Sequence, residues 1–415
     1  MQKSRISGKL WRFCRMRLDL FWRGMLDECS ESRRRTAQGV LAAAFFSTLG
    51  VGAFTFAMSL SAGSSGLSSY WLGLAFSGYF LARLVLAPLA GYCADFIGPM
   101  PMLLTATGLG AAVPLLQFFF PATETLGVIQ ISLGFCSGIV KPVSMSLLGD
   151  CVPDERRGRL FGAYNTFLYA ALVTGPLVGG LAVNLQGGIQ SLILFCPGVG
   201  MGLAFLAFLR ASTSSPVSSM RKDKAKGGPP WRDMSFLSLL LAVLGRTTGA
   251  SVVITFLPRL INERFGLDGM LAGLLFALPN IMIIVGMPVT SRWADVRDKS
   301  GLTFLGMGIC AACLFAFGQP VSVWSFAGLA ALMGFGSALS LPASMSLASE
   351  MGPAKGSVMG VFLGASNLGF VLGPALSGLA VRNGGMADAF ELVALFSGLC
   401  LLPTFLVMSR RLYAE

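Results

Sequence analysis

The sequence contains no histidine and little charge, and each shortage excludes a class of protein. Only 12% of its 415 residues are charged, whereas soluble domains carry about a quarter. Histidine performs much of the acid–base catalysis and metal binding that proteins carry out near neutral pH. The GxxxxGK[ST] segment that holds the phosphates of ATP is also missing. We therefore predict that the chain is not an enzyme and uses neither a metal nor a cofactor.

The nine cysteines show no spacing typical of a disulfide framework. Cys310 and Cys313 form a CxxC sequence, which in other contexts binds metal or performs redox chemistry. No second pair of ligands accompanies it, and both residues lie in an apolar segment. We favour the interpretation that they are small packing residues.

Apolar sequence, in contrast, is abundant. Hydrophobic residues make up 54% of the chain, which also has 52 glycines, and glycine is more frequent in membrane helices than in soluble ones. A helix needs about 20 apolar residues to cross the hydrocarbon core of a bilayer. We predict an all-α integral membrane fold whose twelve transmembrane helices lie at residues 37–60, 70–92, 101–121, 125–148, 159–184, 188–209, 235–258, 270–292, 302–319, 322–347, 357–381 and 386–409.

The net charge of +12 follows the predicted topology. If the amino terminus is cytoplasmic, 25 of the 31 Lys and Arg residues fall in cytoplasmic segments. This asymmetry is the positive-inside rule. We therefore expect both termini in the cytoplasm, a multi-pass protein of the cell's inner (plasma) membrane with the lipid bilayer as partner, and no nucleic-acid binding.

The first 35 residues do not resemble a cleavable signal, because no apolar core follows their basic start directly. Trp11, Phe21 and Trp22 share one side of a helical wheel with other apolar residues, and Arg12 and Arg23 lie on the other side. Such a helix tends to lie in the membrane interface. A partly ordered cytoplasmic tail is the alternative.

The chain repeats itself with an offset of 200 residues. The sequence PVSMSL at 142–147 matches PASMSL at 342–347, and Gly73 and Pro88 match Gly273 and Pro288. We predict a basic amphipathic segment at 1–35, a six-helix bundle at 36–209, a polar cytoplasmic linker at 210–234 and a second six-helix bundle at 235–411.

Three motifs carry a resemblance to a known family. GYCAD at 91–95 follows the second span, DCVPDERRG at 150–158 follows the fourth, and the fifth span spaces Gly162, Ala171, Gly175, Pro176, Gly179 and Gly180 as G-x8-G-x3-G-P-x2-G-G, with alanine at the second place. The eleventh span repeats this spacing with Gly360, Gly369, Gly373, Pro374, Ser377 and Gly378. The layout resembles the major facilitator superfamily, and the fifth-span motif resembles that of its antiporter and efflux members.

The resemblance implies a set of residues that act in conformational change. Small residues let helices touch, and a proline permits a kink, so a close kinked contact can serve as a pivot. Ordinary tight packing is the alternative. The gating residues implied are Asp95, Asp150, Arg156, Arg157, Asp295, Arg297, Gly175, Pro176, Gly373 and Pro374.

Three basic residues lie deep in predicted spans, and no acidic residue does. Each buried cation costs about 2.5–3.5 kcal/mol on insertion scales, which argues for a role. In the family the first, fourth, seventh and tenth spans line the central cavity, so Lys141 and Arg246 are expected to face it from opposite halves. We expect Lys141, Arg246, Arg83 and the weaker candidate Asn280 to bind the solute; Lys141 could instead serve carbonyls freed by Pro142, and Arg83 could brace the halves.

The sequence therefore predicts a transporter, expected to be a monomer, that exports or exchanges a small organic anion by alternating access. The alternative within transport is multidrug-type efflux of amphipathic compounds, favoured by the antiporter-type motif and by the abundance of Phe and Met. A transporter-like sensor or scaffold is the alternative of another class. Coupling to protons through a buried carboxylate is not expected, because no span contains one.

Overall fold

The computed structural model describes residues 31–62, 66, 68–120, 122–151, 154–184, 189–212, 233–351 and 355–412. Within these ranges every regular element is a helix, as expected from the sequence. The amphipathic segment predicted before residue 31 and most of the predicted linker lie outside the described residues.

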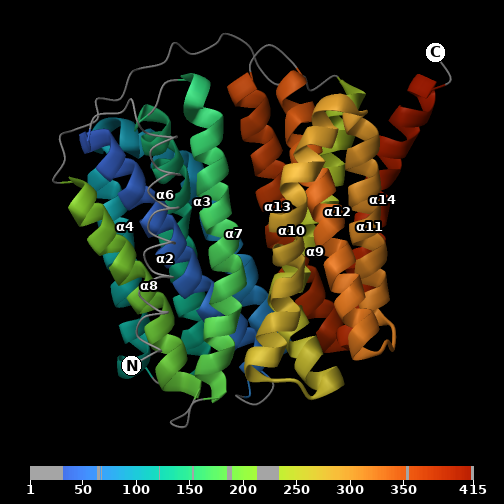
Figure 1. Ribbon diagram of the computed structural model, residues 1–415. Coiled ribbons are helices and arrows are strands. Elements are labelled where there is room, and N and C mark those ends of the chain that lie inside the picture. Colours follow the sequence, from blue (N-terminus) through green and yellow to red (C-terminus); the bar gives the residue numbers. More distant parts are fainter. Residues whose placement is uncertain are drawn as a thin grey trace, which may run out of the picture.

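The first half of the chain forms long helices joined by short connections (Figure 1). They are α2 (Glu31–Ser61), α3 (Ser69–Ile97), α4 (Pro99–Ala112), α6 (Thr123–Cys151), α7 (Asp154–Asn184) and α8 (Ile189–Ser212). The expected span at 101–121 is interrupted: after α4 the chain passes through the 3-10 turn η1 (Val113–Leu115) into α5 (Leu116–Phe119). Pro114 has no amide hydrogen to donate, which accounts for the break.

The second half repeats this pattern. Its helices are α9 (Met234–Phe265), α10 (Gly269–Val296), α11 (Lys299–Gly318), α12 (Val323–Glu350), α13 (Lys355–Asn383) and α14 (Met386–Leu412). Helix α2 packs on α7 and α8, and its counterpart α9 packs on α13 and α14; likewise α3 packs on α6 and α10 on α12. The repeat in the sequence is therefore also a repeat in tertiary contacts.

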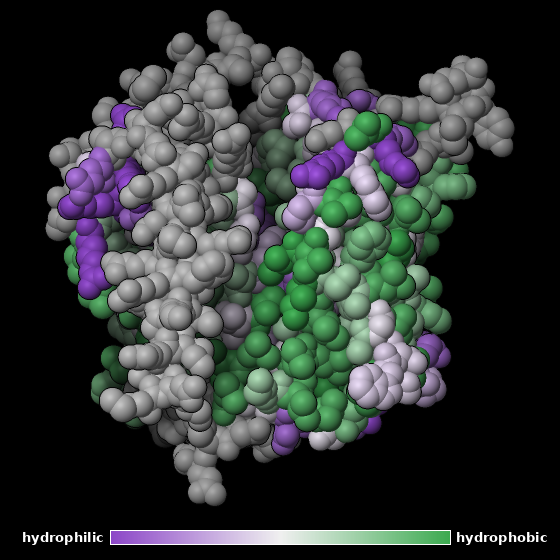
Figure 2. Space-filling view, viewed as in Figure 1, coloured by the Kyte–Doolittle hydropathy of each residue, from purple (hydrophilic) through white to green (hydrophobic). Residues whose placement is uncertain are grey.

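Ten of the described helices are long and apolar enough to cross a membrane. The outer surface agrees, because large apolar side chains such as Leu109, Val285 and Leu399 are exposed on it, and Figure 2 shows a broad apolar face over the second half. Soluble monomers rarely expose such areas. Hydrocarbon is the environment that suits this surface.

The two halves meet mainly through three helix pairs: α3 with α13, α7 with α10, and α2 with α9. In Figure 1 the halves converge toward the bottom of the view and diverge toward the top. Figure 2 shows a hollow that enters between them near the top. We call the bottom, where α2 ends and α3 begins, the closed end, and the opposite end the open end.

Candidate functional site

A cavity of about 230 Å³ lies between the two halves. Most of its wall comes from the first half, through α2, α3, α6, α7 and α8, while the second half contributes Ile254, Phe276 and Asn280. The cavity is large enough for a small organic molecule, and its wall is mainly apolar with a few polar groups, the composition typical of ligand sites.

Two of the three deep cations line this cavity. Arg83 reaches it from α3 and Lys141 from α6. The two helices touch here because glycine faces the contact: a Cβ on Gly138 would lie 3.0 Å from the Arg83 Cα atom. Lys141 follows Gly138 by about one helical turn. The small residue thus brings both cations to one wall.

Hydrogen bonding extends the polar wall around the cations. The Tyr79 hydroxyl lies 3.0 Å from the Ser137 hydroxyl, and the Arg83 guanidinium lies over the Tyr79 ring at 5.6 Å. All three of these residues line the cavity. Within the described part of the chain, no acidic side chain forms an ion pair with Arg83 or Lys141. Among the described residues, the wall therefore presents two cations without an acidic partner.

The floor of the cavity, toward the closed end, is aromatic. Phe56 of α2 contacts Phe276 of α10 across the two halves, with ring centroids 5.3 Å apart, and Phe76 lies beside them on the wall. One polar pair interrupts this floor: the Gln130 amide donates to the Thr55 hydroxyl at 3.4 Å. The Gln130 side-chain oxygen has no hydrogen-bond partner in the described structure.

The structure separates Arg246 from the other two deep cations. Arg246 is half-buried on α9, is not part of this cavity's wall, and its Nε atom is buried without a hydrogen-bond partner among the described residues. The neighbouring Thr247 and Thr248 hydroxyls donate to carbonyls of their own helix. The expected grouping of Arg246 with Lys141 in one cavity is not what this conformation shows. Of the four expected solute-binding residues, Arg83, Lys141 and Asn280 lie together.

The two Gly-Pro motifs join helices within and between the halves. Gly175 faces the α2 backbone, since a Cβ there would lie 3.1 Å from the Leu49 carbonyl oxygen. The Pro176 carbonyl lies against α10, 2.7 Å from a Cβ built on Gly273. Helix α7, which carries this Gly-Pro motif, therefore packs between α2 of its own half and α10 of the other half.

The repeat reproduces this arrangement. Gly373 packs on the backbone of Thr248 in α9, and the Pro374 carbonyl lies against Gly73 of α3, where a Cβ would overlap it. These cross-half contacts lie toward the closed end, so the motifs identified in the sequence form the interface there.

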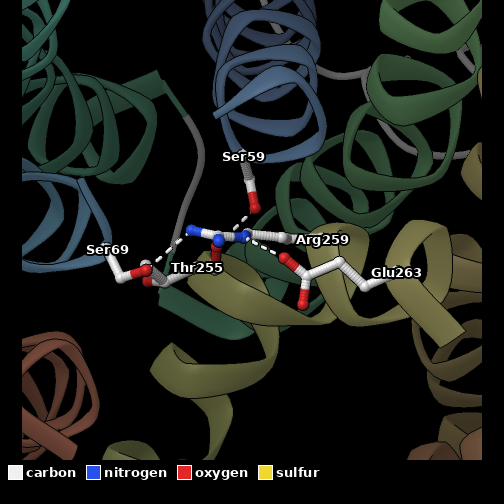
Figure 3. Close-up of polar contacts among 5 residues, drawn as sticks. All are labelled: Ser59, Ser69, Thr255, Arg259 and Glu263. Atoms are coloured by element: carbon white, nitrogen blue, oxygen red, sulfur yellow. Dashed lines mark hydrogen bonds and ion pairs between the residues drawn. The ribbon is translucent and has the colours of Figure 1, made fainter. Parts of the chain in front are cut away.

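A polar cluster at the closed end was not predicted from the sequence (Figure 3). Arg259 of α9 donates from Nη1 to the Ser69 hydroxyl of α3 at 2.7 Å and from Nε to Glu263 at 2.6 Å. The Ser59 hydroxyl of α2 donates to the Thr255 carbonyl of α9. We call these five residues the closed-end latch. The signal available in the sequence was an arginine near the end of a span on the side with few basic residues.

The predicted gating residues of the connecting loops lie at the open end. Asp95, Asp150 and Asp295 fall in the last turns of α3, α6 and α10, and Arg156 and Arg157 in the first turn of α7, but their side chains lie outside the described structure. Arg297 is exposed, with its guanidinium over the Trp293 ring at 5.7 Å.

Comparison with known proteins identifies the family. The model of the Major Facilitator Superfamily matches residues 40–321 and 239–413. The uncharacterized MFS-type transporter MJ1560 of Methanocaldococcus jannaschii is 24% identical over 85% of this chain and 93% of its own length. Multidrug resistance protein MdtG of Proteus mirabilis is 24% identical over 78% of this chain and 82% of its own. The class E tetracycline resistance protein of Escherichia coli is 26% identical, with 71% and 75% covered.

Solved structures share the fold. A bacterial homolog of the human lysosomal transporter Spinster, in an inward-facing and occupied conformation, superposes with a TM-score of 0.77 at 13% identity and covers 92% of this chain and 97% of that chain. A mutant of the nucleoside transporter NupG gives 0.70 at 14% identity, with 90% and 99% covered. The family and these relatives are transporters rather than enzymes, as the sequence predicted. The chain belongs to the major facilitator superfamily and is a multi-pass membrane transporter of that family.

Proposed function

We propose that this transporter exports or exchanges a small organic anion, which it binds through Arg83 and Lys141. The observation that carries the proposal is the presence of both cations on the wall of the central cavity, with no acidic partner among the described residues. Cations placed in a membrane are costly, so a mobile counter-charge that neutralises them when it binds is favourable. Asn280 adds a polar group from the opposite half.

In the proposed orientation the protein lies in the inner membrane of the cell and its open end faces the cytoplasm. The basic residues in the α6–α7 and α10–α11 connections and at the end of α14 lie at the open end, whereas Arg259, Arg264 and Arg382 lie at the closed end. By the positive-inside rule the open end is cytoplasmic. The cavity would then be loaded from inside the cell, with twelve spans, both termini cytoplasmic and a monomer as the working unit.

Alternating access follows from how the halves are joined. The contacts between halves described above, including the latch and the two Gly-Pro contacts, lie toward the closed end. Rocking one half against the other would break these contacts and close the open end around the same cavity. The motif helices α7 and α13, each packed on both halves, are the proposed pivots, and loop residues such as Asp95 and Arg156 the proposed open-end gate.

Counterflow in liposomes tests transport itself. Purified protein is reconstituted with unlabelled anion inside, and entry of the labelled anion against the unlabelled pool is followed. A sensor or scaffold would bind the anion without exchanging it. A purely drug-like efflux protein, the other transport alternative, would exchange neutral or cationic amphipaths and leave anions untouched.

Variants test the role of the cations. A hydrogen bond to a charged group contributes about 1.5–3 kcal/mol, so Lys141→Gln and Arg83→Gln should each weaken anion affinity about 10- to 150-fold. Arg292→Gln, which removes an exposed cation near the open end of α10, is the charge-matched control and should leave affinity unchanged. Unaltered anion affinity in both cavity variants would refute the proposal.

A further inference from the structure

The cavity is polar at one depth and apolar at another. Along α3 the lining residues run from Phe76, near the closed end, through Tyr79 and Phe80 to Arg83. Seven residues separate Phe76 from Arg83, or about 10 Å at 1.5 Å per residue. Along α6 the cation Lys141 lies eleven residues from Gln130 at the floor, about 16 Å by the same rise. The cations therefore lie well above an apolar floor.

Helix α7 adds a mainly apolar stripe to the cavity wall. Tyr164, Leu168, Leu172 and Pro176 all line the cavity, and their spacing of four residues places them on one helix face. Leu168 and Leu172 are only half-buried, so the cavity is what they face. Ile254 of α9, also half-buried, joins this wall from the second half.

We infer that the solute is an elongated amphipathic anion, with its charged group at Arg83 and Lys141 and its apolar body along Leu168, Leu172 and Ile254 toward the phenylalanine floor. This inference rests on the proposed function and narrows its substrate class. A small hydrophilic anion would leave the apolar wall wet. A cationic amphipath would satisfy the wall but would face two cations of its own sign. One solute with both features uses the whole cavity.

An amphipathic anion also reconciles the two transport functions predicted from the sequence. Export of an organic anion and efflux of amphipathic compounds call for different walls, and this cavity has both. Gln130 adds one acceptor at the floor, because its side-chain oxygen has no partner in the described structure. A solute with a hydrogen-bond donor at its far end would satisfy it.

Straight-chain alkanesulfonates test the inference, because they stay ionised and differ only in chain length. Butane-, hexane- and octanesulfonate, each below its micelle-forming concentration, are titrated into the purified full-length protein by calorimetry. Each buried methylene should tighten binding about fourfold. Octyltrimethylammonium, of opposite charge and similar length, should not bind measurably.

Two variants separate the apolar wall from the cations. Leu172→Ser should flatten the dependence on chain length while the affinity for butanesulfonate changes little. Lys141→Gln should weaken binding of every sulfonate by a similar factor and leave the slope intact. Leu399→Ser, which makes the same kind of change on an exposed position of α14 outside the cavity, is the matched control and should alter neither.

The outcomes that would overturn each idea are distinguishable. Equal affinity for all chain lengths, with a loss in Lys141→Gln, would overturn the amphipathic inference and leave the anion proposal standing. A steep chain-length dependence with no loss of affinity for any sulfonate in either Lys141→Gln or Arg83→Gln would overturn the anion proposal, and with it the assignment of the charged group. Tight binding of octyltrimethylammonium would overturn the anionic character of the solute.

Discussion

Arg259 on α9 and Ser69 on α3 join the two halves of the molecule by a hydrogen bond of 2.7 Å at the closed end. Because Arg259 also pairs with Glu263 one turn further along its own helix, the guanidinium is held in place to reach across the interface. The Ser59 hydroxyl and the Thr255 carbonyl make a second cross-half bond beside it. Both bonds must break for the halves to separate at this end.

The latch should stabilise the conformation in which the two halves are joined at the closed end. Arg259→Gln removes the hydrogen bond from Arg259 to Ser69, which is worth at most about 1.5–3 kcal/mol. It also removes the ion pair with Glu263, which contributes little because Glu263 is 43% exposed. We expect a Thr55→Cys reporter in the cavity to react several-fold faster with a membrane-impermeant thiol reagent applied at the closed end.

Arg264→Gln is the matched control for the latch. Arg264 lies on the same helix, and its partners among the described residues are carbonyls of its own half, those of Phe317, Gly318 and Gln319. Its replacement should leave the labelling rate of the reporter unchanged. Equal labelling of the Arg259→Gln variant and the parent protein would contradict a latching role.

Close approach of the halves should depend on glycine at two equivalent positions. Gly73→Ala would place a Cβ against the Pro374 carbonyl, and Gly273→Ala would place one 2.7 Å from the Pro176 carbonyl oxygen. Overpacking of this kind costs about 1–3 kcal/mol, so each variant should slow counterflow by roughly 5- to 150-fold.

Gly364→Ala on α13 is the control for these glycine variants, because no atom of the described residues lies within 4 Å of a Cβ at that position. Its transport should match that of the parent. If Gly73→Ala and Gly273→Ala also transport normally, the contact is looser in solution than the structure indicates and the motif helices are not pivots.

Arg264 should contribute to stability rather than to transport. Its guanidinium donates to three carbonyls at the end of α11, at 2.7, 3.0 and 2.7 Å, where the helix dipole favours a cation. Arg264→Gln should lower the free energy of unfolding by about 2 kcal/mol and lower the thermal midpoint by a few degrees, while the KM for transport stays the same. An unchanged midpoint would show that water replaces these bonds at no cost.

Arg246 offers a direct comparison between the sequence-based expectation and the structure. Arg246 is not on the wall of the cavity. We therefore expect Arg246→Gln to leave the Kd for octanesulfonate nearly unchanged in the conformation described above, whereas Lys141→Gln should raise it. Equilibrium binding to the two variants, measured side by side, decides the matter. A loss of octanesulfonate affinity as large as that of Lys141→Gln would show that Arg246 belongs to the binding site.

Much of the architecture could be predicted from the chain alone because its causes are local. Hydrophobic length predicts helices, and the repeated Gly-Pro spacing predicts where they pack tightly, since a missing side chain is visible in the sequence. Arg83 and Lys141 could be chosen because a cation in an apolar span is costly wherever the span lies. The break near Pro114 was missed, although proline was present, because prolines are tolerated inside membrane helices.

The apolar helices, the two-fold repeat and the costly deep cations can all be read from the sequence. The fold is needed to see that Arg83 and Lys141 share one wall while Arg246 lies apart, and that Arg259 reaches Ser69, 190 positions away. Hydropathy is a property of a single helix, and for that reason it reveals the helices but not these neighbours. The direction in which a side chain points depends on how each helix is rotated against its neighbours, and its partners depend on how the two halves are docked.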